Sequence, residues 1–107
     1  MPPLESDFQR SLLSRIRAAL PGCYILKNDP TYLQGVPDIT ILYGDRWAAL
    51  EVKRSAKARK RPNQDYRVNE MNDMSFAAVV HPENEEEVLN GLYRALQAPR
   101  NTRVPKR

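Results

Sequence analysis

The chain has only one cysteine and one histidine, and it is poor in aromatic residues. A lone cysteine excludes a disulfide framework within the chain and a cysteine-based zinc cluster, and Cys23 stands in an apolar run where a small core residue is expected. His81 has no second histidine with which to form a dyad, so we expect a structural role for it. No apolar run approaches the length of a membrane span, and no signal peptide is visible. The default expectation is a soluble cytoplasmic protein with no membrane partner.

Charge is distributed unevenly along the 107 residues. The chain has 17 Lys and Arg against 13 Asp and Glu, a net charge of +4. The whole excess falls in residues 98–107, which hold four basic residues and no acid, and which we expect to form a disordered tail. Residues 1–97 have the length of a single domain. They contain no internal repeat and no low-complexity segment.

A hairpin is the most informative stretch of the sequence. Residues 39–43 and 47–52 are apolar and typical of strands, and Gly44-Asp45 is a turn dipeptide. With a two-residue turn, the numbers of opposed residues sum to 89, so Asp38 lies across from Glu51. Their β-carbons would be about 5 Å apart. Strand alternation places Lys53 on the same face as Glu51.

These charges have two alternative explanations. A solvated hairpin end with ordinary surface charges is the common case for such a pattern. Three features favour a functional site instead. The segment Gly35-Val36-Pro37 directs the chain into the strand, Glu51 and Lys53 interrupt an apolar strand, and the register brings two acids together. Opposed carboxylates repel each other unless a cation lies between them.

The other elements follow from periodicity and from turn residues. We predict helices over residues 4–20, 62–71 and 83–96, and further strands over 23–27 and 75–80. The result is an α/β fold, a mixed four-stranded sheet flanked by helices. Glu5 lies within the apolar arc of the first helix. An acid there can interact with the helix dipole, but Asp7 would do so equally well, so a role for Glu5 at the site stays open.

Pro37-Asp38 followed by Glu51-Val52-Lys53 resembles the signature of the PD-(D/E)xK nuclease superfamily. The Gly-Val-Pro-Asp spelling is similar to compact VRR-NUC-type and phage Holliday-junction-resolvase-like endonucleases. The resemblance covers residues 4–97 and implies a restriction-endonuclease-like αβββαβ(α) core, and for a viral protein a location in the host cytoplasm. It also implies that Glu5 completes a metal site and that the backbone carbonyl of Val52 adds a ligand. The resemblance further implies that Gln64 contacts DNA or the catalytic water. Spacing alone explains Gln64 as an ordinary polar residue.

The residue types at the hairpin indicate metal-assisted hydrolysis. Two or three carboxylates suit Mg²⁺ or Mn²⁺ rather than zinc. Asp38 and Glu51 would hold the ion, and Lys53 would position or deprotonate the water that attacks phosphorus. A basic run placed directly after the site is suited to holding phosphates. It consists of Arg54, Lys57, Arg59, Lys60 and Arg61.

We therefore expect a Mg²⁺-dependent endodeoxyribonuclease that acts as a homodimer on branched DNA, above all on four-way junctions. The domain has no module that could read base edges, and a symmetric dimer matches a symmetric junction. The alternatives are a sequence-specific restriction-type enzyme, a non-catalytic nucleic-acid-binding module, and a small regulatory or interaction protein. The loop 28–34 or a sheet edge could supply the dimer contact. Asn28, Asp29 and Tyr32 could line the cleft, although turn chemistry also explains them.

Overall fold

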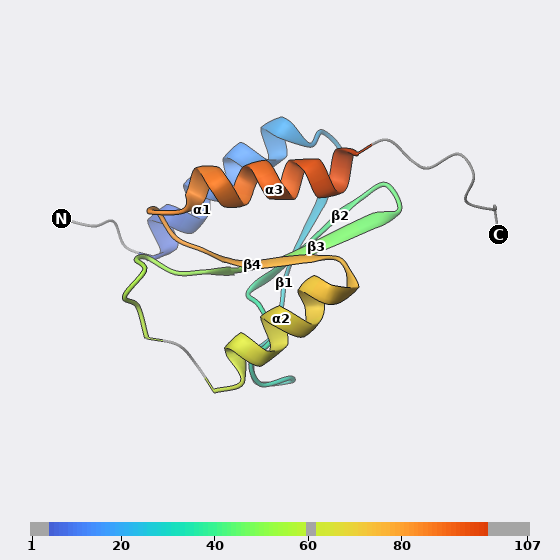
Figure 1. Ribbon diagram of the computed structural model, residues 1–107. Helices are drawn as coiled ribbons and strands as arrows, with labels where there is room; N and C mark the ends of the chain where they lie inside the picture. The colour runs from blue at the N-terminus through green and yellow to red at the C-terminus, as the bar shows by residue number, and fades with distance from the viewer. Residues whose placement is uncertain (1–4, 60–61, 99–107) are drawn as a thin grey trace.

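The computed structural model describes residues 5–59 and 62–98. Three helices and four strands alternate along the chain in the predicted order (Figure 1). The elements are α1 Glu5–Ala19, β1 Tyr24–Lys27, β2 Ile39–Tyr43, β3 Arg46–Val52, α2 Gln64–Met74, β4 Phe76–Val80 and α3 Glu85–Gln97. The predicted α/β fold with a mixed four-stranded sheet is confirmed.

The strands lie in the sheet in chain order, β1-β2-β3-β4. The first two pairings are antiparallel, and β3 and β4 are parallel. A parallel pair needs a crossover connection, and α2 supplies it. The pairs in the β2–β3 hairpin run from Tyr43 opposite Arg46 to Ile39 opposite Leu50, so the predicted register is confirmed.

Helices cover both faces of the sheet. Helices α1 and α3 lie side by side on one face, and α2 lies on the other (Figure 1). The main core is between the first pair and the sheet, and its fully buried side chains include Leu12, Ile16, Ile41, Leu50 and Leu92. A smaller cluster on the second face joins α2 to β3 and β4 through Val68, Ala49 and Ala77. The portion of this face formed by β1 and β2 is left more open.

Two helix starts differ from the prediction, each for a local reason. Helix α2 begins at Gln64 rather than at residue 62 because Asn63 adopts a left-handed conformation (φ 64°), which a right-handed helix cannot include. Helix α3 begins at Glu85 because residues 82–84 form a turn. In that turn the side chain of Asn84 accepts the N–H of His81 and donates to the carbonyl of Val79.

Some predictions fall outside the described residues. These are the helical start at residue 4, the two basic residues Lys60 and Arg61, and the tail beyond residue 98. Within the part of the chain that the structure describes, no helix is both long and apolar enough to cross a membrane.

Candidate active site

The loop before β2 is held against the start of α2. Gly35 has a φ of 85°, and a Cβ on it would lie 2.7 Å from the backbone oxygen of Asn63. Only glycine fits this close approach with this backbone conformation. The side chain of Asn63 and that of Arg67 donate to Gln34, at 3.2 Å each. These contacts tie the segment that leads to Asp38 to the first turn of α2.

Asp38 and Glu51 hold each other through backbone groups. The N–H of Asp38 donates to Oε1 of Glu51 at 3.1 Å, and the N–H of Val52 donates to Oδ2 of Asp38 at 2.9 Å. This reciprocal arrangement follows from the hairpin register, which places residue 38 beside residue 51. Both carboxylates are therefore fixed at the open end of the hairpin, the end away from its turn.

Lys53 lies at the same end of the hairpin as the two acids and pairs with Glu51. Its Nζ lies 3.3 Å from Oε2 of Glu51 and donates to the backbone oxygen of Arg59 at 2.9 Å. Glu51 is 1% exposed and Lys53 8% exposed. The group combines two acidic residues with one basic residue. Buried charges are weak evidence for stability, because desolvation opposes their attraction, and this favours a functional role.

Gln64 is the third buried polar side chain, with 1% exposure. Among the residues that the structure describes, neither its amide nitrogen nor its amide oxygen has a hydrogen-bond partner. Buried polar groups are nearly always bonded, so an exception requires an explanation. Gln64 opens α2, the helix that the Gly35–Asn63 contact ties to the loop before Asp38.

Two of these side chains have the chemistry of metal ligands. Asp38 and Glu51 offer hard carboxylate oxygens, and Mg²⁺ is commonly bound by one or two carboxylates with water and substrate phosphate completing its shell. These residues fit. No group of three or more His, Cys, Asp or Glu that could hold a metal occurs within residues 5–59 and 62–98. The structure therefore does not bring Glu5 into one cluster with Asp38 and Glu51. Its ligand role, like that of the Val52 carbonyl, stays a prediction.

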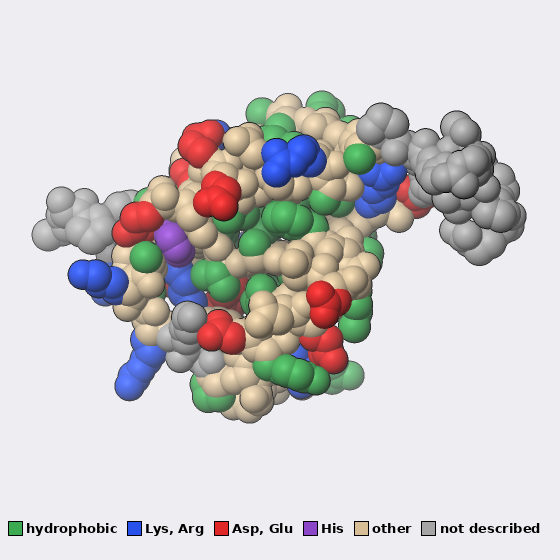
Figure 2. Space-filling model, in the orientation of Figure 1, with side chains coloured by type: hydrophobic (Ala, Val, Ile, Leu, Met, Phe, Trp, Pro, Cys, Tyr) green, Lys and Arg blue, Asp and Glu red, His purple; other side chains and the backbone are tan. Residues whose placement is uncertain are grey.

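The basic segment after Lys53 folds back toward the site. The bond from Lys53 to the carbonyl of Arg59 closes a loop over residues 54–58, and Arg54, Lys57 and Arg59 are exposed. The carboxylate of Glu83 accepts from its own backbone N–H and from that of Ala56, and these bonds lower its pKa. Figure 2 shows Lys and Arg side chains projecting at the left, the end where β3 and β4 finish in Figure 1.

One feature beside Lys53 was missed by sequence reasoning. A hollow of about 170 Å³ is lined by Lys53, Ser55, Ala56, Ala58, Val79, His81 and Asn84. It forms because β3 and β4 are parallel neighbours, so that the residues following both strands meet at one end of the sheet. His81 Nδ1 lies 3.1 Å from Oε1 of Glu83. The sequence predicted a mixed sheet but did not specify which two strands pair in parallel. The residues Asn28, Asp29 and Tyr32 line a different hollow, of about 340 Å³, with Leu33 and Val36.

Comparison with known proteins does not assign the chain to a family. No family model, no curated protein and no solved structure matches the chain. Its function must be argued from the site itself.

Proposed function

We propose that the protein is a divalent-metal-dependent endonuclease that hydrolyses phosphodiester bonds in DNA. The observation that carries the proposal is the group of Asp38, Glu51 and Lys53 at the open end of the hairpin. Two carboxylates are held in place by backbone N–H groups, and a buried ammonium lies 3.3 Å from one of them. The resemblance of this residue pattern to PD-(D/E)xK nucleases supports the same reaction.

The proposed chemistry assigns a task to each residue. A bound Mg²⁺ or Mn²⁺ would place positive charge next to a phosphate oxygen and would make a bound water molecule more acidic. Asp38 and Glu51 would hold the ion, and their bonds to backbone N–H groups keep the two carboxylates in one geometry. Lys53 positions the attacking water through Nζ and offsets negative charge that develops on the phosphate. Gln64 offers an amide that can orient the same water or a phosphate oxygen.

The direct test is cleavage of DNA with and without Mg²⁺. Asp38→Asn, Glu51→Gln and Lys53→Ala should each lower turnover by about a thousandfold or more, and combining them should add little because the residues act as a unit. Asp45→Asn is the matched control, since it removes an acid from the other end of the same hairpin. It should leave turnover unchanged. Turnover like that of the natural sequence in Glu51→Gln would refute the assignment.

A second readout separates metal binding from catalysis. An ion that binds only the folded state raises the melting temperature as its concentration rises. Mg²⁺ in the millimolar range should raise the melting temperature of the natural protein and have a smaller effect on Glu51→Gln. A metal-dependent shift without any cleavage would support the alternative of a binding module that lacks catalysis.

We further propose a homodimer that prefers branched DNA, and the open portion of the sheet supports this part. β1 is an edge strand, and Tyr24 and Leu26 expose apolar surface beside Leu42 on the face that α2 leaves uncovered. Tyr24→Arg should convert a dimer to a monomer in light scattering and reduce the preference for a four-way junction over linear duplex. Tyr66→Arg is the control, because Tyr66 on α2 is 60% exposed and Tyr24 69%. A natural protein that is monomeric at micromolar concentration and cuts both substrates equally fast would contradict the dimer and the junction preference alone.

A further inference from the structure

A basic hollow of about 330 Å³ lies between α1 and the end of β1. It is lined by Ser6, Gln9, Arg10, Leu13, Arg17 and Lys27. Three of these residues are cations, and none is an acid. The hollow shares no residue with the basic segment that follows Lys53.

The lining residues meet through helix spacing and strand alternation. On α1 each of them lies three or four residues from another, so they share one side of the helix. This side is next to the stripe of Phe8, Leu12 and Ile16 that enters the core. Lys27 has the same orientation as Ile25 on β1, toward the layer of α1 and α3. The cations are therefore brought together only by the packing of α1 on the sheet.

The spacing of the cations suits an extended anion. Arg10 and Arg17 are seven residues apart, roughly 10 Å along the helix axis, so their side chains can contact different phosphates of one strand. A chain of phosphates can contact both, and Ser6 and Gln9 offer the polar groups that commonly bond phosphate oxygens. Arg10 also pairs with Asp7 at 3.4 Å, but both side chains are exposed and such pairs are weak.

The hollow is close to the candidate site along the sheet. Lys27 pairs with Ile39, the residue after Asp38, and the N–H of Asn28 donates to the carbonyl of Asp38 at 2.7 Å. β1 and β3 are both antiparallel to β2, so they finish at the same end of the sheet. A nucleic acid bound at Asp38 and Glu51 would thus reach Lys27 after crossing the end of one strand. Leu13, the apolar residue of the hollow, is 6% exposed and offers little surface for insertion into lipid.

We propose that this hollow is a second binding site for the nucleic-acid backbone, in which Arg10, Arg17 and Lys27 contact successive phosphates. The inference rests on the proposed function for the identity of the polyanion and adds a surface on the opposite side of the sheet from α2. In this arrangement the bound DNA passes around the end of β1 and contacts the protein on both faces of the sheet.

The test is the salt dependence of binding to a duplex of about three helical turns, measured with the full chain in EDTA so that no cleavage occurs. Each lost phosphate contact lowers the slope of log K against log salt by about 0.9. The triple variant Arg10→Ala, Arg17→Ala, Lys27→Ala should lower the slope by about two to three times this amount. Arg17→Ala alone should lower the slope by about this amount once. Arg94→Ala is the matched control, because Arg17 and Arg94 are each the basic residue in the last turn of their helices. It should leave the slope unchanged.

The outcomes separate this inference from the proposed function. An unchanged slope in the triple variant, with circular dichroism showing a native fold, would overturn the second site even if the enzyme cuts DNA normally. A reduced slope in a protein that shows no metal-dependent cleavage would support the second site and refute the nuclease. Loss of binding to anionic phosphatidylserine vesicles without any change in DNA binding would overturn the inference in favour of a lipid surface.

Discussion

The β2–β3 hairpin carries charged residues at both ends, and the two ends differ in how deeply these residues are buried. At the turn, Asp45 is exposed and Arg46 is half-buried. At the open end, Glu51 and Lys53 are almost completely buried. The two strands, their register and their sheet are the same, so the difference arises from what packs against each end.

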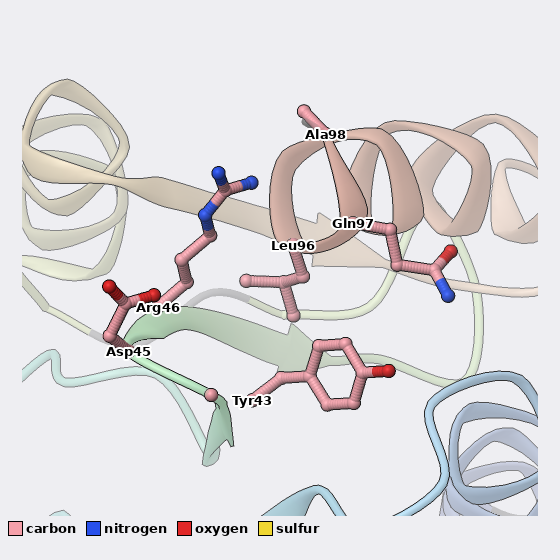
Figure 3. A pocket seen from close by; sticks show the side chains of 7 residues that line it. Tyr43, Asp45, Arg46, Leu96, Gln97 and Ala98 are labelled. Atoms are coloured by element: carbon pink, nitrogen blue, oxygen red, sulfur yellow. The ribbon is translucent and has the colours of Figure 1, made fainter. Parts of the chain in front are cut away.

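The charges at the turn have a structural explanation. Arg46 donates to the backbone oxygen of Ala95 at 3.1 Å, in the last turn of α3, where a cation is favoured by the helix dipole. Figure 3 shows Arg46 reaching toward this helix end, with Tyr43 and Leu96 beside it. The hollow between them, about 380 Å³, is the junction of the hairpin turn with the end of α3. This arrangement contributes to folding and needs no ligand.

Backbone groups also bond the charged side chains at the open end, but there the cost of desolvation opposes what those bonds contribute to stability. The buried charges at this end would be replaced by apolar residues if stability alone were selected, since a well-packed apolar group is often as stabilising as a buried ion pair. A place where the sequence departs from what folding favours is where a functional site is expected. The comparison teaches that burial of charge, rather than the presence of charge, distinguishes the candidate site from the turn.

The largest expected effect is on stability when Lys53 loses its charge. Lys53→Met should lower the free energy of unfolding by about 3–5 kcal/mol, because Glu51 would stay buried without this cation. Arg46→Met at the turn should lower it by only about 1 kcal/mol, the value of one partly exposed hydrogen bond. Urea denaturation measures both. The double variant Glu51→Gln, Lys53→Met should recover part of the loss. Equal losses at the two ends would remove the contrast.

A pair of glycines tests the same contrast through the backbone. Gly35→Ala should cost about 3 kcal/mol, because strain at positive φ is combined with a clash against Asn63. Gly44→Ala at the turn should cost about 1 kcal/mol, since it also has positive φ but a Cβ would meet no atom within 4 Å. Thermal melts compare the two variants. We expect Gly35→Ala alone to impair cleavage, and impaired cleavage in Gly44→Ala would contradict this.

The smallest expected effect concerns the buried amide of Gln64. Gln64→Leu should raise the free energy of unfolding by about 1 kcal/mol, because it removes two buried polar atoms that lack partners among the described residues. The same change should reduce turnover if the amide orients water or phosphate. A more stable protein with lower activity is the expected signature of a site residue. A less stable protein with unchanged turnover would show that Gln64 is structural.

The sequence predicted the parts of the site that depend on local structure. The two-residue turn at Gly44-Asp45 set the register, and the register placed Asp38 beside Glu51. Burial could not be predicted in this way. Whether Lys53 is exposed depends on the carbonyl of Arg59, and the environment of Gln64 depends on how the loop before β2 meets α2. Nothing in the spacing of Arg10, Arg17 and Lys27 along the chain indicates that these three residues meet.

What the sequence determined by itself is therefore the order of the elements and the geometry of the hairpin, because apolar periodicity and turn chemistry act over a few residues. The tertiary structure alone decided that β4 lies parallel to β3, that α2 begins beside the loop before Asp38, and that α1 meets the end of β1. These contacts join residues far apart in the chain. They are selected by how the apolar faces of all the elements pack together, and no short stretch of sequence contains that information.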